Sequence, residues 1–185
     1  GVSNAASSLH LLVLAAGAGT RFGSAKQLAP INGQPMLRTV LGRAVDVAGN
    51  FVSVVLGAYA TELAPLLGRM PVTVIVNQNW REGLASSIRA GIERLPGSCS
   101  AAMLVLADQP TVSAADLQRL ADAWRCAPQS IVAAQYGGIT GAPVIFPRRD
   151  FGALLELRGD RGARLLLRRY ETRVIKVPMP AAAID

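Results

Sequence analysis

An apolar run that ends abruptly in a glycine-rich loop constrains the fold of this chain more than any other feature. The run spans residues 11–16, and glycines follow at positions 17, 19 and 23, interleaved with Arg21 and Lys26. A short apolar run without alternation is typical of a strand that is covered on both faces of a parallel sheet. Glycine backbones can take positive φ and bring their N–H groups up to an anion. The stretch therefore predicts a buried strand that delivers a phosphate-binding loop.

The two cations of this loop strengthen that prediction. Lys26 is one of only two lysines in the chain, the other being Lys176. A lysine acts on a phosphate as a compact point charge, whereas an arginine can bind two oxygens at once. The spacing fits neither a Walker A loop nor the dinucleotide-binding fingerprint. The alternative is a tight strand-to-helix turn whose cations are only solvated.

Length and charge narrow the function classes. A chain of 185 residues needs only one core, so residues 9–185 are expected to form one domain after a flexible tail at residues 1–8. The net charge of +7 favours anionic partners in general. Aromatic residues make up only 5% of the chain, and no basic run is interleaved with them, so nucleic acid is not expected as a partner.

The cysteines and the single histidine give no sign of a metal site. Cys99 and Cys126 lie far apart without a Cys-x-x-Cys pair, and His10 lies at the first strand, so reduced thiols and a structural histidine are expected. No apolar run reaches the roughly 18 residues that span a bilayer. The first residues lack the basic start of a signal peptide. We therefore expect a cytoplasmic protein that does not bind membranes.

Strand-like and helix-like segments alternate after the loop, which is typical of crossover units in an α/β fold with a mainly parallel sheet. A turn-rich stretch at residues 136–143 resembles a hairpin connection, which would make the sheet mixed. Strands are predicted at residues 51–57, 72–76, 103–107, 131–134, 144–146 and 173–177. Helices are predicted at residues 35–48, 60–67, 148–157 and 165–170, with two more beginning near Gly83 and at Ser113.

Polar residues at the expected ends of these elements are candidate ligands. Gly83 and Ser87 lie where a helix begins, and a helix N-terminus can hold a phosphate or a ribose hydroxyl. The alternative is that they only cap the helix while Trp80 packs in the core. Asp108 follows a buried strand, where a carboxylate projects into the ligand crevice of an α/β sheet and can hold Mg²⁺. The alternative for Asp108 is a plain turn residue, and Asp160 either completes the site or is solvated surface.

Beyond these residues, the sequence resembles the MobA-like nucleotidyltransferases of molybdenum cofactor biosynthesis, more closely the MocA-like cytidylyltransferases than the guanylyltransferases. The resemblance spans nearly the whole chain after residue 8, and five ordered motifs are far more specific than any one of them. The motifs are Leu14-Ala15-Ala16-Gly17-x-Gly19-x-Arg21-Phe22-Gly23-x-x-Lys26, Asn79-Trp80-x-x-Gly83-Leu84-x-x-Ser87, Asp108-Gln109-Pro110, Gly141-x-Pro143-Val144-x-Phe146 and Gly159-Asp160-x-Gly162-Ala163-Arg164.

The resemblance implies a three-layer αβα nucleotide-diphospho-sugar transferase fold, Rossmann-like, with a mostly parallel mixed sheet. It implies that the nucleotide contacts Leu14, Ala15, Ala16, Gly17, Gly19, Arg21, Lys26, Asn79, Gly83 and Ser87. Catalytic roles are implied for Lys26, Arg21 and Asp108. Mg²⁺ is expected on Asp108, with Asp160 as a second metal ligand. The acceptor is expected near Gln109, Pro110, Gly141, Pro143 and Asp160.

The implied reaction joins a nucleoside monophosphate to a phosphorylated pterin, molybdopterin or its metal-loaded form, with release of pyrophosphate. Such a transfer depends on alignment and charge neutralisation and does not require a general base. Ala15 and Ala16 stand where guanylyl relatives tend to carry glycines, and two methyl groups would narrow the base pocket. CTP is therefore favoured over GTP as the donor. A molybdenum hydroxylase is a further partner that the resemblance suggests.

Two other function classes stay open. A non-catalytic carrier or insertion chaperone with the same fold would bind a molybdenum cofactor without transferring a nucleotide. An oxidoreductase that binds a dinucleotide would need an acidic residue at the end of the second strand, where the chain has Gly57 followed by Ala58 and Tyr59.

Overall fold

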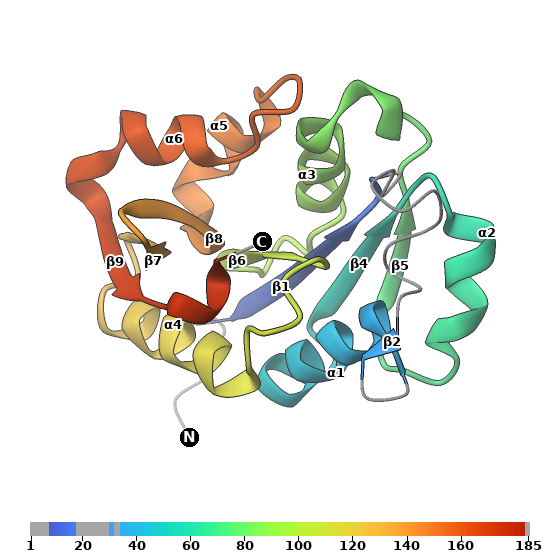
Figure 1. Cartoon of the computed structure of the whole chain (residues 1–185). Coiled ribbons are helices and arrows are strands. Elements are labelled where there is room, and N and C mark those ends of the chain that lie inside the picture. Colours follow the sequence, from blue (N-terminus) through green and yellow to red (C-terminus); the bar gives the residue numbers. More distant parts are fainter. Residues whose placement is uncertain (1–7, 18–29, 32–33, 184–185) are drawn as a thin grey trace.

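The computed structural model describes residues 8–17, 30–31 and 34–183. A seven-stranded mixed sheet runs through it with the strand order β5-β4-β1-β6-β8-β7-β9 (Figure 1). Its strands are β1 (Leu9–Ala15), β4 (Val52–Leu56), β5 (Thr73–Val76), β6 (Ala101–Leu106), β7 (Ile131–Tyr136), β8 (Ile139–Pro147) and β9 (Val174–Pro178). A separate two-stranded ladder consists of β2 (Pro30–Ile31) and β3 (Gln34–Pro35).

Helices connect most of the strands. The α-helices are α1 (Met36–Ala48), α2 (Ala60–Leu63), α3 (Leu84–Glu93), α4 (Ala114–Cys126), α5 (Phe151–Leu155) and α6 (Arg164–Arg169). Short 3-10 helices are η4 (Ala64–Leu67), η5 (Trp80–Glu82), η6 (Arg148–Asp150), η7 (Glu171–Arg173) and η8 (Pro180–Ala182). No helix within the described ranges combines the length and the apolar character that a membrane crossing needs.

Strand β1 divides the core into two layers because its side chains alternate between the faces of the sheet. Leu11 and Val13 pack in the core that α1, α2 and α4 cover, whereas Leu12 and Leu14 pack in the core that α3, α5 and α6 cover. Every residue of β1 is buried, as expected for the central strand of a sheet covered on both faces. The predicted three-layer α/β architecture is therefore confirmed (Figure 1).

The connections of β1 define where a ligand can bind. β1 pairs in parallel with β4 on one side and with β6 on the other. The chain moves outward from β1 to β4 and β5, then returns across β1 to form β6, so the strand order reverses at this place. Open α/β sheets bind ligands outside the carboxyl ends of their strands at such a reversal. The carboxyl ends of β1 and β6 are therefore the expected crevice.

The C-terminal part of the sheet confirms the predicted hairpin and corrects one helix. β8 is antiparallel to both β6 and β7, which makes the sheet mixed. Residues 148–157, predicted as one helix, divide into η6 and the short α5. Asp150 lies at this junction, buried, and both of its carboxylate oxygens accept hydrogen bonds of 2.9 Å from Arg173. This buried, bidentate ion pair anchors the chain at the junction where the predicted helix divides.

The opposite end of the sheet holds the single histidine in a structural role, as predicted. His10 is buried, its Nε2 lies 3.0 Å from Ser53 Oγ, and its ring meets Phe51 edge to face. Burial lowers the pKa of His10 below its usual range. Cys99 and Cys126 are free thiols, also as predicted. Ser8, the last residue of the predicted tail, accepts a hydrogen bond of 3.0 Å from Ser100 N and donates one of 2.8 Å to Ser98 O.

Candidate nucleotide and acceptor site

The carboxyl ends of β1 and β6 bring several predicted site residues to one edge of the sheet. Ala107 N donates a hydrogen bond of 3.1 Å to Leu14 O, so the half-buried Asp108 directly follows a residue that is tied to β1. Ala15 and Ala16 are buried, whereas Gly17 is exposed where the predicted phosphate loop begins. Gly19, Arg21 and Lys26 lie outside the described residues, so their placement stays a prediction.

Trp80 and Ala16 approach the end of β4 so closely that only a glycine fits at position 57, directly after this strand. A Cβ on Gly57 would lie 2.6 Å from Trp80 Cβ and 2.7 Å from Ala16 O. Ala58 N also donates a hydrogen bond of 3.1 Å to Ala16 O. Gly57 therefore leaves no room for the acidic side chain that a dinucleotide-binding oxidoreductase carries at this position.

The acidic residues of this edge suit a metal ion that is shared with a nucleotide. Within the described ranges, no group of three or more histidine, cysteine, aspartate or glutamate side chains could hold a metal ion by itself. Mg²⁺ usually takes only one or two protein carboxylates and completes its shell with water and substrate phosphates. Asp108 fits this mode, in which the protein supplies one ligand and the phosphates supply others.

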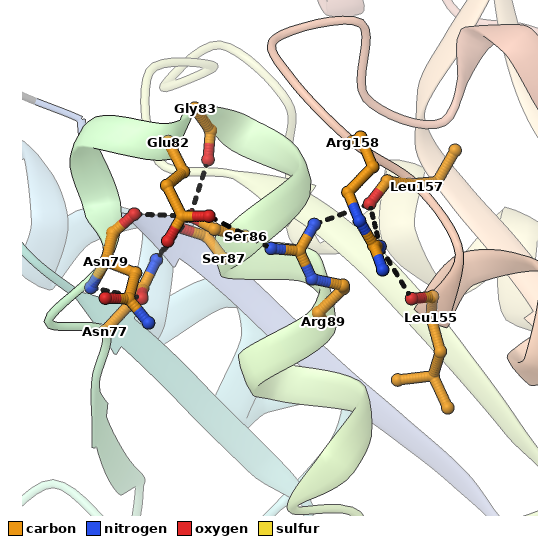
Figure 2. Close-up of polar contacts among 10 residues, drawn as sticks. All are labelled: Asn77, Asn79, Glu82, Gly83, Ser86, Ser87, Arg89, Leu155, Leu157 and Arg158. Atoms are coloured by element: carbon orange, nitrogen blue, oxygen red, sulfur yellow. Dashed lines mark hydrogen bonds and ion pairs between the residues drawn. The ribbon is translucent and has the colours of Figure 1, made fainter.

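A buried polar network organises the start of α3 (Figure 2). Asn77 Nδ2 donates hydrogen bonds to Ser86 Oγ at 2.8 Å and to Ser87 Oγ at 3.0 Å, and Asn77 Oδ1 accepts one of 2.9 Å from Asn79 N. Asn77, Ser86 and Ser87 are all buried. Ser87, a predicted nucleotide ligand, is thus held by Asn77, a residue that the sequence analysis did not select. The one feature of the sequence that could have indicated Asn77 is its position, because it is a polar residue directly after the predicted strand that became β5.

A turn from far along the chain closes over the beginning of α3. Ala85 N donates a hydrogen bond of 3.0 Å to Gly159 O. Gly83 has φ +101°, and a Cβ there would overlap the Asp160 carboxylate and lie 2.7 Å from Gly159 O. Gly83 and Asp160, both predicted site residues, are therefore in direct proximity. Because Asp160 already places a negative charge at this helix N-terminus, the position suits a hydroxyl group or a cation better than a phosphate.

Arg89 on α3 also contacts the segment that directly precedes this turn (Figure 2). Arg89 Nη1 donates a hydrogen bond of 2.5 Å to Leu157 O, and Arg89 Nη2 lies 3.9 Å from Glu82 Oε1. Arg158 Nη1 donates to Leu157 O at 2.7 Å and to Leu155 O at 3.1 Å. Arg89 therefore connects the segment that follows α5 to α3, and it also connects α3 to η5.

A cavity of about 560 Å³ lies between this turn, α6 and the sheet. Its apolar lining includes Leu14, Leu104 and Val144, and its charged lining consists of Asp160, Arg161, Arg164 and Arg168. Gly141 also lines it, and the position of a Cβ on Gly141 is 3.0 Å from Tyr136 Oη and 3.7 Å from Arg164 Nε. The structure thus brings together the predicted residues Leu14, Gly141 and Asp160. Tyr136, Arg164 and Arg168 were not among the predicted site residues, although Arg164 stands in the last motif.

The remaining predicted acceptor residues are not in the lining of this cavity. Gln109 is buried, and its Nε2 donates hydrogen bonds to Ala142 O at 3.0 Å and to Ala182 O at 2.9 Å. Pro110 O accepts a hydrogen bond from Arg43 Nη1. Pro143 is buried and follows a cis peptide bond. In this structure Gln109 joins the segment after β6 to β8 and to the C-terminal segment, and Ala142, to which it bonds, lines the cavity.

The sequence of this chain matches a known protein family and several known proteins. The sequence profile of the MobA-like NTP transferase domain matches residues 11–174. Nicotine blue oxidoreductase from Paenarthrobacter nicotinovorans is 29% identical over 168 residues, which cover 85% of this chain and 80% of that protein. The bifunctional protein GlmU from Kineococcus radiotolerans is 37% identical over 117 residues. That match covers 61% of this chain but only 24% of the length of GlmU.

Solved structures agree with the sequence comparison. The crystal structure of Rv0371c from Mycobacterium tuberculosis is 28% identical, with a TM-score of 0.83 over 94% of this chain and 89% of that one. A crystal structure of Rv0371c in complex with manganese has a TM-score of 0.80 at 27% identity, over 93% of this chain and 88% of that one. From the family match over most of its length and from its fold, this chain belongs to the MobA-like NTP transferase domain family of nucleotidyltransferases.

Proposed function

We propose that this protein transfers a nucleoside monophosphate, CMP from CTP in preference to GMP from GTP, to a phosphorylated acceptor and releases pyrophosphate. One observation carries the proposal. Leu14 lines the cavity of about 560 Å³, and the predicted triphosphate loop begins only three residues later, just beyond the end of the same strand. A donor in the loop and an acceptor in the cavity would therefore meet at the carboxyl end of β1.

The roles of the residues follow from charge. Arg21 and Lys26 would neutralise the triphosphate, and Lys26 would stabilise the charge that accumulates on pyrophosphate as it leaves. Asp108 would hold a divalent metal, Mg²⁺ by preference, and the manganese complex of Rv0371c supports a divalent ion. When bound, such an ion supplies charge neutralisation across the phosphate oxygens. Asp160, beside Gly83, would accept a hydrogen bond from a sugar hydroxyl or act as a second metal ligand.

The acceptor that best agrees with the family is a phosphorylated pterin such as molybdopterin. Its phosphate would approach the α-phosphorus of the nucleotide from the side of Arg161 and Arg164, which line the cavity. No covalent enzyme intermediate is required, because a phosphate nucleophile is already ionised near neutral pH. The protein then acts by alignment and by electrostatic stabilisation.

Base preference can be tested separately from catalysis. Ala15 and Ala16 are buried in the cores on opposite faces of the sheet, so their two methyl groups do not narrow one base pocket together, as the sequence suggested. Ala16 packs in the same core as Leu14, which lines the cavity, and is therefore the alanine to test. We expect CTP to bind more tightly than GTP, and Ala16→Gly to reduce that ratio. An unchanged ratio in Ala16→Gly would remove the basis for the CTP preference.

The main experiment combines ligand binding with turnover. A nucleotide at 100 times its Kd adds about 2.7 kcal/mol of stability, so CTP with Mg²⁺ should raise Tm by roughly 5–11 °C at about 2–4 °C per kcal/mol. Pyrophosphate release should then require CTP, Mg²⁺ and the pterin acceptor. Asp108→Asn should lower kcat by about a hundredfold or more, the usual cost of losing one strong electrostatic contact. Asp122→Asn on the exposed face of α4 is the matched control.

The same experiment separates the competing functions. A carrier or insertion chaperone would bind the cofactor without releasing pyrophosphate under any condition. The oxidoreductase name of the Paenarthrobacter relative makes redox activity the second candidate. Consumption of NADH or NADPH in the presence of an electron acceptor, with no pyrophosphate release, would favour that candidate despite the lack of room at Gly57.

A further inference from the structure

The charged side of the cavity holds an excess of arginine. Arg161, Arg164 and Arg168 are exposed and line the cavity, and Asp160 is the single acidic residue of its lining. Within the described part of the chain, none of these three guanidinium groups takes part in a hydrogen bond or an ion pair. The cavity therefore presents positive charge that the protein itself does not neutralise.

Helix geometry places two of these cations side by side. Arg164 and Arg168 are four residues apart on α6, a spacing at which side chains are neighbours on one helical face and at which like charges repel. Arg169 belongs to the same helix but lines neither this cavity nor a second hollow of about 290 Å³ next to α6. The chain thus keeps a repulsive pair specifically where the helix faces the cavity.

The positive charge continues past α6 into a second hollow. This hollow of about 290 Å³ shares Arg164, Leu167 and Arg168 with the larger cavity. Its lining also includes Lys176 and the acidic Glu171, which pair at 3.4 Å, so the net positive charge of this hollow comes from Arg164 and Arg168. Because Arg164 and Arg168 line both hollows, a ligand that contacts either arginine from the larger cavity also lies beside the second hollow.

The sheet side of the larger cavity has a different chemistry. The half-buried Leu106 lines this side together with the buried Leu14, Leu104 and Val144, and all four are apolar. Small-molecule sites commonly combine a mostly apolar wall with a few charged groups that fix orientation. An apolar wall combined with arginines suits a molecule with a ring body and charged substituents better than it suits a bare phosphate.

We propose that the acceptor is recognised through a ring body and two separate anionic groups. The first group lies near Arg161 and Arg164 in the larger cavity, and the second lies near Arg168, which lines both hollows. This inference rests on the proposed function only in so far as the cavity is taken as the acceptor site. Arg168 is then a specificity-determining residue, because it binds the anionic group of the acceptor that takes no part in nucleotidyl transfer.

Ring compounds of stepwise charge test this recognition. The full chain is titrated calorimetrically at low ionic strength with naphthalene-2-sulfonamide, naphthalene-2-sulfonate and naphthalene-2,6-disulfonate, without nucleotide. The disulfonate should bind at least about tenfold more tightly than the monosulfonate, a difference of about 1.4 kcal/mol. Arg168→Gln should reduce that gain to within about twofold, and Arg168→Lys should restore most of it because a cation returns to the same place.

Arg169→Gln is the matched control, since it removes the same charge from the same helix outside both hollows. It should leave the tenfold gain intact. Equal affinities for the two sulfonates, an equal loss in Arg169→Gln, or no binding of any of the three compounds would each overturn the proposal.

The titration is independent of the nucleotidyl transfer assay. Tight disulfonate binding that depends on Arg168, without pyrophosphate release from CTP, would support a site for doubly anionic ligands and contradict the proposed nucleotidyl transfer. Pyrophosphate release from CTP, without charge-dependent ring binding, would keep nucleotidyl transfer and contradict the second anionic group.

Discussion

Helices α3 and α4 begin in opposite ways, although each begins near the edge of the sheet that holds the candidate site. At α4 the Ser113 Oγ accepts a hydrogen bond of 3.0 Å from Asp116 N, and Ser113 N donates one of 3.0 Å to Asp116 Oδ2. This capping box satisfies the helix start with residues of its own first turn. At α3 no side chain caps the helix, and Gly159 O accepts the hydrogen bond from Ala85 N.

The comparison shows which helix start depends on a contact between segments that are distant in the sequence. The start of α4 is complete by itself, so a change there should affect only local stability. The start of α3 is complete only when the turn at residues 158–162 lies against it, and that turn carries Asp160 and Arg161 into the lining of the cavity. Changes at α3 should therefore disturb stability and the candidate site together, whereas changes at α4 should not.

The largest effect is expected for Gly83→Ala. Gly83 has φ +101° and ψ −177°, a region that essentially only glycine occupies, and its missing Cβ makes room for Gly159 and Asp160. The backbone cost of about 1–3 kcal/mol and the overpacking cost of about 1–3 kcal/mol should lower the free energy of unfolding by about 2–6 kcal/mol. Urea unfolding measures it. Gly97→Ala, at a glycine with open space and no positive φ, is the control and should lie within about 0.5 kcal/mol of the unaltered protein.

Asn77→Ala should have the next largest effect. The buried Asn77 side chain bonds to the buried Ser86 and Ser87 and to the backbone of Asn79, and its removal takes one hydrogen-bond partner from each of them. We expect a loss of about 1–3 kcal/mol in the free energy of unfolding. The Kd for CTP should also rise, because Ser87 and the loop before α3 lose their support. If Asn77→Ala behaves like Gln78→Ala at the exposed neighbouring position, the network does not organise α3.

Gly162→Ala and Gly137→Ala form a matched pair that isolates the contact between the turn and α3. The two glycines have φ of +57° and +54°, so both variants carry a similar left-handed backbone cost of about 1–2 kcal/mol. Only at Gly162 would the new Cβ meet a neighbour, Leu84 Cδ2 at 2.8 Å. The loss in Gly162→Ala should therefore exceed that in Gly137→Ala, and only Gly162→Ala should weaken binding of naphthalene-2,6-disulfonate. Equal losses would mean that the turn does not lie tightly against α3.

Ser113→Ala tests the self-contained start of α4. Loss of an N-cap hydroxyl usually costs about 1 kcal/mol. We expect that decrease in the free energy of unfolding and no change in the Kd for CTP or for the disulfonate. A change in either Kd would show that the start of α4 is coupled to the site and would break the contrast with α3.

How far the sequence could predict this molecule follows from the same contrast. The strands of the seven-stranded sheet, most helices and the hairpin were predictable because apolar periodicity and turn residues are local signals, whereas the two-residue strands β2 and β3 are too short to show a period. Asp108 at the end of β6 was predictable because a polar residue that follows a buried strand must emerge at the sheet edge. The approach of Gly159 and Asp160 to Gly83 was not predictable from pattern, because contacts between distant segments leave no periodicity. Arg168 was missed for a related reason, since a helical arginine is ordinarily a solvated residue.

The smallest effect concerns the pH dependence of the α4 cap. Partial burial of Asp116 by itself would raise the pKa of that carboxyl, but hydrogen bonds from the Ser113 backbone and from Arg119 outweigh it, and the pKa lies below its usual value of 3.8. A carboxyl whose pKa is lowered on folding stabilises the protein above the unfolded pKa, and that stability is lost as the pH falls through the folded pKa. Asp116→Asn removes this titration and leaves the other carboxyl groups unchanged. The difference in free energy of unfolding between the two proteins, measured in urea, should therefore be constant near neutral pH and shrink as the pH falls below about 4. Parallel pH profiles for the two proteins would mean that Asp116 does not stabilise α4 as a carboxylate, and the cap of α4 would then depend on the Ser113 hydroxyl alone.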